Sequence, residues 1–115
     1  MKRGRTHLDY LYDIEEAIQK GLSFIDGMSY TDFAADEKTQ YALIRAIEVI
    51  GEASKKVSDE VKANFSFVPW KEMSGMRDKL IHDYFGVDEE VVWNTATQDL
   101  PELKKYINEI LDSIK

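Results

Sequence analysis

The chain has 115 residues, of which 43% are hydrophobic and 32% charged, a composition that fits one folded domain and argues against disorder. It contains no cysteine, which excludes disulfides, thiolate metal sites and cysteine nucleophiles. Its formal net charge of −7 opposes non-specific binding to phosphate backbones, so any nucleic-acid function requires a local basic site.

The spacing of apolar residues predicts a long first helix over residues 6–25. Thr6 is placed to cap its N-terminus, and Asp9 follows three residues later, where an acidic side chain suits the helix dipole. Gly21 weakens the interior of this helix and indicates close contact with another helix. Residues 26–29 are predicted to form a turn. Apolar residues mark one face at steps of three and four, namely Leu8, Leu11, Ile14 (or Tyr12), Ala17, Ile18, Leu22 and Ile25.

Asp36 is expected to cap a second long helix over residues 37–57. The three-residue spacing of Arg45 and Glu48 predicts an ion pair along this helix. Gly51 in mid-helix indicates close approach to another helix or to a partner subunit. The apolar arc is wide enough to indicate more than one neighbour, and it comprises Tyr41, Ile44, Ile47 (or Glu48) and Gly51 on one side with Leu43, Ala46, Ile50 and Ala53 beside them.

The second half of the chain predicts shorter elements. Residues 58–65 form a short helix or turn, and Pro69 suits the first position of a helix over residues 69–85, which Gly86 is placed to end. Asp88 is expected to cap a further helix. Residues 99–101 are expected to break or kink the chain. The inward residues of these last two helices are predicted to be Val91, Val92 (or Trp93), Ala96, Leu103, Tyr106, Ile107, Ile110, Leu111 and Ile114.

These elements predict an all-α fold, an antiparallel bundle of four to five main helices in a single domain over residues 1–115. The sequence shows no strand alternation and no hairpin signal, and the loops between the predicted helices are mostly short. It has no apolar run of about 18 residues and no apolar signal-peptide core after its basic start. We therefore expect no membrane span and a cytoplasmic location.

Residues 76–86 gather the side chains best suited to chemistry. Arg77 and Tyr84 are seven residues apart, so on one helix they lie almost on one line, whereas His82 points elsewhere. Asp78 precedes His82 by four residues, which allows the carboxylate to fix the imidazole tautomer and raise its basicity. Because one helix does not bring Arg77 and His82 together, the stretch resembles half of a site.

A structural interpretation of the same residues stays open. A lone histidine on an amphipathic helix is more often packed or exposed than catalytic, and an arginine near an aspartate is usually a surface pair. His7 is best interpreted as a surface residue. With two histidines far apart and no cysteine, no transition-metal site stands out and no cofactor is expected.

The stretch Arg77-Asp78-Lys79-Leu80-Ile81-His82-Asp83-Tyr84 resembles the Arg-x4-His-x-Tyr signature of the HEPN superfamily, in particular the HepT-like toxins of MntA/HepT toxin–antitoxin modules. The resemblance covers nearly the whole chain. It includes residues 45–53, Pro69-Trp70, Tyr84-Phe85, Trp93 and Asp99-Leu100-Pro101. Many relatives carry asparagine after the arginine, whereas this chain has Asp78.

The resemblance implies a metal-independent endoribonuclease that works as a homodimer, with both motif helices facing one cleft. It implies catalytic roles for Arg77, which would hold the scissile phosphate, and His82, which would transfer protons. It further implies a nucleotidyltransferase antitoxin as partner, in a complex of the homodimer with that antitoxin. The antitoxin would transfer AMP to Tyr84.

Two alternatives from other classes remain at this point. One is a non-catalytic helical partner of a minimal nucleotidyltransferase, serving as its substrate-binding or regulatory subunit, which the acidic net charge favours. The other is a helical bundle in which Arg77 and His82 are structural and Tyr84 only lines a surface. The clusters Lys55-Lys56 and Lys104-Lys105 are either solvated faces or guides for RNA.

Overall fold

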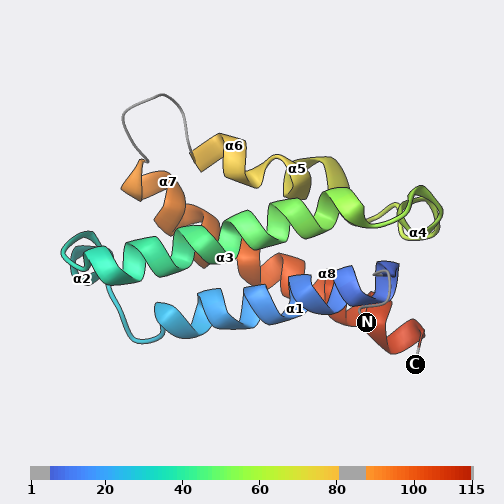
Figure 1. Ribbon diagram of the computed structural model, residues 1–115. Helices are drawn as coiled ribbons and strands as arrows, with labels where there is room; N and C mark the ends of the chain where they lie inside the picture. Colours follow the sequence, from blue (N-terminus) through green and yellow to red (C-terminus); the bar gives the residue numbers. More distant parts are fainter. Residues whose placement is uncertain (1–5, 81–87, 115) are drawn as a thin grey trace, which may run out of the picture.

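The computed structural model describes residues 6–80 and 88–114, and the chain within these ranges is helical with no strand (Figure 1). This confirms the all-α prediction. The longest helices in these ranges are α1 (His7–Phe24), α3 (Glu37–Lys56) and α8 (Leu100–Ser113). The predicted Gly86 cap lies outside the described residues.

The first long helix begins where the sequence predicts. The Thr6 hydroxyl accepts a hydrogen bond from the backbone N–H of Asp9, whose carboxylate accepts one from the backbone N–H of Thr6. A short helix not predicted from the sequence, α2 (Tyr30–Ala34), follows and is capped in the same way by Ser29 and Asp32. The predicted apolar face is correct except at Leu8, which is exposed at the first turn of α1.

Helix α3 also begins and ends as predicted, with Asp36 as its N-cap and Val57 as its C-cap. It contacts α1, α2, α5, α6 and α7, which explains its wide apolar arc. Tyr41 is an exception to that arc because 69% of it is exposed. In Figure 1, α3 runs through the middle of the molecule, with α1 on one side and α5 and α6 on the other.

The single helix predicted over residues 69–85 is wrong. Up to residue 80, where the described part of this span ends, the chain forms two helices instead, α5 (Trp70–Ser74) and α6 (Met76–Leu80). The separate short helix predicted over residues 58–65 is confirmed as α4 (Asp59–Asn64). Gly75 ends α5, because its backbone angles, φ −92° and ψ 1°, depart from those of an α-helix, and α6 begins at the next residue. Pro69 is the N-cap of α5 rather than its first residue, and Trp70 anchors the turn by donating its Nε1–H to the carbonyl of Phe65 at 3.0 Å.

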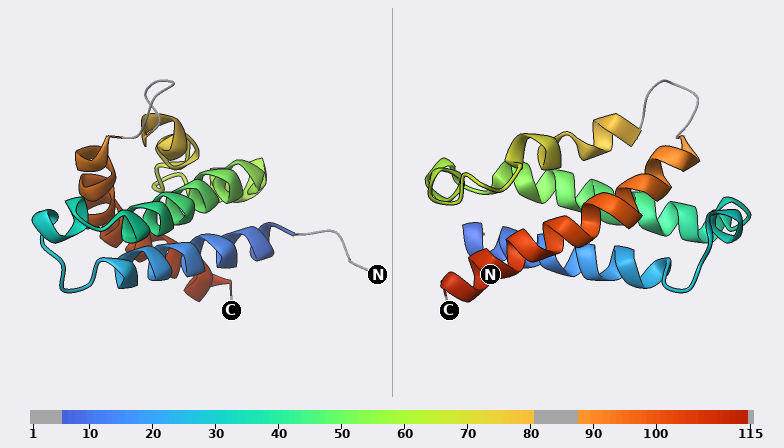
Figure 2. Two further views of the ribbon diagram at one scale, coloured as in Figure 1. Left: turned by 60° about the vertical axis from the view of Figure 1, so that its left-hand side comes forward. Right: turned by 180° about the vertical axis from the view of Figure 1, so that it is seen from behind.

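The helical path is not interrupted at residues 99–101. Helix α7 (Glu89–Asn94), which Asp88 caps as predicted, continues through a π-helical segment η1 (Thr95–Asp99) into α8. The N–H of Leu100 reaches the carbonyl of Thr95, five residues back. The wider π turn precedes Pro101, which has no N–H to donate to the helix. The right-hand view of Figure 2, seen from behind, shows this continuous path crossing in front of α1 and α3.

One hydrophobic core joins the elements before and after α3. The inward prediction for α8 is correct except at Ile114, which is exposed. No helix within the described ranges is both long and apolar enough to cross a membrane. Largest among the fully buried side chains of the core are Phe33, Leu11, Ile14, Ile18, Leu43, Ile47, Ile50, Met73, Leu80, Leu100, Ile107 and Ile110.

Candidate functional site

Arg77 lies on α6 and reaches across to α3. Its Nε–H donates to Oε2 of Glu48 at 3.3 Å, across 29 residues of sequence. The arginine side chain is 46% exposed and the glutamate 27%. The guanidinium is therefore held from its inner edge while remaining accessible to solvent.

Gly51 explains how α6 comes so close to α3. A Cβ built on Gly51 would lie 3.5 Å from the carbonyl oxygens of Met73 and Ser74 and 3.9 Å from Cβ of Arg77. The end of α5 and the start of α6 thus pack directly on the α3 backbone. This confirms that Gly51 marks a close helix contact, here with α5 and α6 of the same chain.

Asp78 adds a second carboxylate beside the arginine. Its Oδ1 is 3.7 Å from Nη1 of Arg77, an ion pair longer than a hydrogen bond, and its side chain is 72% exposed. The predicted contact between Asp78 and His82 lies outside the described residues, as do His82 and Tyr84 themselves. The predicted line from Arg77 to Tyr84 therefore stays a prediction.

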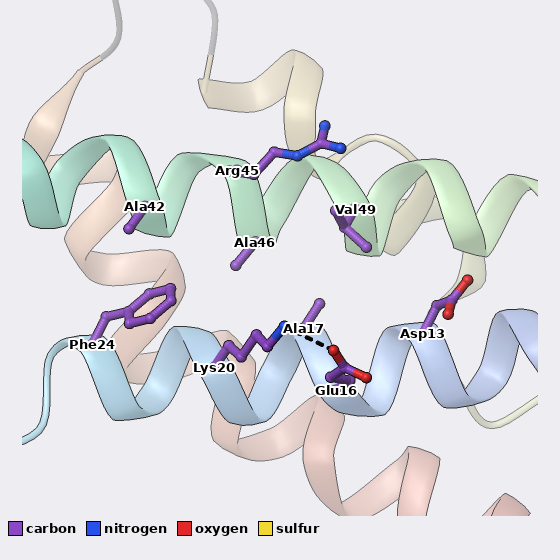
Figure 3. Close-up of a pocket in the computed structure, with 9 residues that line it drawn as sticks. All are labelled: Asp13, Glu16, Ala17, Lys20, Phe24, Ala42, Arg45, Ala46 and Val49. Carbon is purple, nitrogen blue, oxygen red and sulfur yellow. Dashed lines mark ion pairs between the residues drawn. The ribbon is translucent and has the colours of Figure 1, made fainter.

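The predicted pair between Arg45 and Glu48 is wrong, because Glu48 binds Arg77 instead. Among the described residues, Arg45 has no ion-pair partner. Figure 3 shows its guanidinium projecting from α3 away from α1. The sequence signal for the real pair was weak, since a contact across 29 residues leaves no periodic pattern. Only Gly51, three residues after Glu48, indicated a close neighbour at this part of α3.

A groove of about 410 Å³ lies between α1 and α3, with Ala17, Ala46 and Val49 among its lining residues (Figure 3). Lys20 on its α1 side pairs with Glu16 at 2.7 Å. That contact lowers the pKa of Glu16 through its hydrogen bond and charge. The charges around the groove are of both signs, and Arg77 is not among its lining residues. It is thus separate from the candidate site.

The described part of the site can bind an anion through one guanidinium. Nε lies 3.3 Å from Oε2 of Glu48, and Nη1 lies 3.7 Å from Oδ1 of Asp78. A planar guanidinium with free N–H groups suits the oxygens of a phosphate. Within the described ranges, no three or more carboxylate or imidazole side chains gather as they would around a metal ion.

The fold and this site together define an all-α domain that presents the accessible Arg77 guanidinium on a packed helical frame. Comparison with known families then identifies the group. Residues 14–110 match the family described as "Ribonuclease HepT-like", and the chain belongs to this family. The HepT-like resemblance inferred from the sequence is thereby confirmed.

Individual relatives agree with this assignment. The chain is 52% identical over 100 residues to "Probable ribonuclease HepT" of Thermococcus cleftensis, covering 87% of this chain and 91% of the relative. It is 43% identical to "Putative RNase MJ1216" of Methanocaldococcus jannaschii, covering 92% and 88%. It is 42% identical to "Putative RNase TTE0752" of Caldanaerobacter subterraneus subsp. tengcongensis over the full length of both chains. No solved structure matches the chain.

Proposed function

We propose that the protein is a metal-independent endoribonuclease, the toxin of a toxin–antitoxin module, and that residues 1–115 act as one domain in the cytoplasm. The observation that carries the proposal is the accessible Arg77 guanidinium, fixed against α3 in a member of the Ribonuclease HepT-like family. Several relatives are named as ribonucleases, which supports RNA as the substrate.

The reaction needs a phosphate ligand and a proton-transfer group. In the proposed mechanism, Arg77 binds the scissile phosphate and stabilises the extra negative charge of the phosphorane. His82 accepts the proton of the 2′-hydroxyl and returns a proton to the departing 5′-oxygen, with Asp78 orienting the imidazole. The products would be a 2′,3′-cyclic phosphate and a 5′-hydroxyl.

A homodimer would complete this site. On a motif helix continued to residue 82, the five-residue spacing would separate Arg77 from His82, whereas a two-fold axis would supply both residues twice in one cleft. We place the motif helix and the α3 segment of residues 45–53 at that interface. The exposure of Arg45 and Tyr41 on α3 is compatible with contact to a second copy.

Control of the toxin would come from a nucleotidyltransferase antitoxin that transfers AMP to Tyr84. The added phosphodiester would place negative charge and bulk at the cleft and repel RNA. A complex of the homodimer with the antitoxin would bring the nucleotidyltransferase active site to this phenol.

One observation favours a second candidate, a non-catalytic substrate or regulatory subunit of the nucleotidyltransferase. Both Glu48 and Asp78 lie beside Arg77, so the described part of the site carries more negative than positive charge. Such a site binds phosphate less readily than a free arginine does. Under this candidate, Tyr84 is a substrate for AMP transfer and no RNA is cut.

Cleavage of RNA by the purified protein in EDTA tests the two candidates. We expect His82→Ala to lower the cleavage rate by at least about a hundredfold, the usual contribution of a general acid or base. The control is His7→Ala, which removes the other histidine at the start of α1 and should cut RNA like the unaltered protein. Equal cleavage by His82→Ala would remove His82 from the mechanism. No cleavage by any form, combined with AMP transfer to Tyr84, would favour the second candidate.

A further inference from the structure

Arg77 depends on one residue of α3 for its orientation. An arginine side chain has four rotatable bonds, and fixing them costs conformational entropy that a single contact must offset. Only one hydrogen bond among the described residues holds this guanidinium, the one from Nε–H to Oε2 of Glu48 at 3.3 Å. Asp78, which is 3.7 Å away and largely exposed, exerts a weaker hold.

The α3 surface is shaped to support this contact. Glu48 and Gly51 are three residues apart, so they lie on the same face of α3. At Gly51 the stem of Arg77 approaches the helix backbone, and one turn earlier Glu48 meets the guanidinium. Glu48 is the less exposed partner and belongs to a 20-residue helix packed on five others, which makes it the fixed member of the pair.

The edge that Glu48 occupies decides which edge remains for a ligand. The carboxylate takes Nε, on the side of the guanidinium facing α3, while at the far end Nη1 makes the longer contact of 3.7 Å with the exposed Asp78. A phosphate can then bind the outer N–H groups without displacing Glu48. The pair therefore orients the arginine rather than blocking it.

We propose that Glu48 is a positioning residue, which holds Arg77 with its outer edge directed at the scissile phosphate. This role rests on the proposed ribonuclease function. Glu48 itself touches no substrate in this scheme. Misplacing a substrate-binding group by about 1 Å costs on the order of a hundredfold in rate, so the loss of Glu48 should act on kcat through Arg77.

Three substitutions separate positioning from structure. Glu48→Ala should lower kcat by about tenfold to a hundredfold with little change in melting temperature. Glu48→Gln keeps an oxygen that accepts from Nε–H, so its kcat should stay within about threefold of the unaltered value. The matched control is Glu16→Gln on α1, where the carboxylate pairs with Lys20 at 2.7 Å beside the separate groove. It should leave kcat unchanged.

A second measurement follows the contact without relying on activity. The Arg77 Nε–Hε signal in a ¹⁵N NMR spectrum should persist at neutral pH in the unaltered protein and in Glu48→Gln. It should be lost to solvent exchange in Glu48→Ala, because the hydrogen bond that protects this proton is gone.

The outcomes distinguish this role from the function on which it rests. An unchanged or higher kcat in Glu48→Ala, while the unaltered protein cuts RNA, would overturn the positioning role alone. A higher rate would mean that Glu48 competes with RNA for the arginine. No cleavage by the unaltered protein would overturn the proposed function and this role together.

Discussion

At the scale of single residues, two glycines inside long helices, Gly51 and Gly21, have different surroundings. Gly51 lies under the candidate site, where an added Cβ would make ordinary contacts of 3.5 to 3.9 Å with neighbouring atoms. Gly21 on α1 lies in the core, where an added Cβ would come within 3.0 Å of Cδ1 of Leu100 and 3.3 Å of Cδ1 of Leu43. Gly51 therefore has room for one methyl group, whereas at Gly21 the Leu100 and Leu43 side chains would have to shift by a few tenths of an ångström to accept one.

Alanine substitutions should reveal this difference. Either change gains about 0.5 to 1 kcal/mol from the better helix propensity of alanine. We expect Gly51→Ala to keep that gain and to raise the free energy of unfolding by up to about 1 kcal/mol. In Gly21→Ala, crowding against the two leucines should cost about 1 to 3 kcal/mol and outweigh the gain.

Urea unfolding of both variants at one protein concentration measures the two effects. Because both are glycine-to-alanine changes within long helices, each serves as the control for the other. A less stable Gly51→Ala together with a more stable Gly21→Ala would contradict the packing described for these helices.

The contacts of these glycines could be predicted from the sequence, whereas the ion-pair partner of Glu48 could not. Both glycines could be predicted to mark close helix contacts, because a glycine within a helix needs a reason. The partner of Glu48 could not be predicted, because helical spacing offers Arg45 as the nearest cation. The choice of Arg77 follows from the packing of α6 on Gly51, which depends on the tertiary fold.

At the scale of elements, the helix starts depend on side-chain caps. The Asp36 carboxylate accepts from the backbone N–H of Thr39 at 3.1 Å and from its hydroxyl at 2.8 Å. The backbone hydrogen bond and then the hydroxyl lower the pKa of Asp36 from its ordinary value of 3.8. The N-terminus of α3, the helix that carries Glu48, is thus stabilised by an ionised cap.

We expect Asp36→Ala to lower the melting temperature by about 4 to 8 °C, because the N–H of Thr39 loses its acceptor and the first turn of α3 loses a negative charge. Asp36→Asn should retain most of the stability near pH 6, since asparagine also caps helices well. Thermal melts followed by circular dichroism at 222 nm measure both. A melting temperature of Asp36→Ala equal to that of the unaltered protein would show that the cap contributes nothing to stability.

The same variants test the pH dependence. Because folding lowers the pKa of Asp36, its contribution is complete above pH 3.8 and is lost as the pH falls through the folded-state pKa. The unaltered protein should therefore lose its advantage over Asp36→Asn on acidification from about pH 6 to about pH 2.5. Glu16, whose pKa is also lowered, is present in both proteins and cancels in the comparison.

The boundaries of α1 and α3 and the start of α7 could be predicted because each helix has a capping side chain followed by an amphipathic run. Helix α2 was missed because five residues are too few for a periodic pattern, although Ser29 and Asp32 have the spacing of a capping box. The end of α5 at Gly75 could not be predicted, because residues 69–85 show one continuous helical pattern. The π segment before Pro101 also has no sequence period of its own.

At the scale of the whole molecule, charge limits how RNA can bind. The net charge of −7 opposes the broad electrostatic attraction on which most nucleic-acid proteins rely. Under the proposed function, binding must therefore come from a few direct phosphate contacts at Arg77 rather than from a wide basic surface. The main alternative surface for binding phosphates is the exposed pair Lys104 and Lys105, which lies on α8 and not on the helices of the candidate site.

The salt dependence of RNA binding tests this restriction. Each phosphate contact to a single strand contributes a slope of about −0.7 to a plot of log K against log salt concentration. One or two contacts, the number that one or two copies of Arg77 supply, predict a slope of about −0.7 to −1.4. Fluorescence anisotropy of a labelled single-stranded RNA with the His82→Ala protein, which leaves the RNA intact under the proposed mechanism, would measure it.

Two variants test which side chains make the phosphate contacts that determine the salt-dependence slope. Arg77→Gln should bring the slope close to zero, because the only proposed phosphate ligand on α6 is lost. Lys104→Gln combined with Lys105→Gln makes a larger change in total charge but should leave the slope unaltered. A slope steeper than about −3, or one that falls only in the α8 variant, would mean that RNA binds along a lysine surface. The site would then lie away from Arg77, since an acidic molecule has no other means of attracting several phosphates at once.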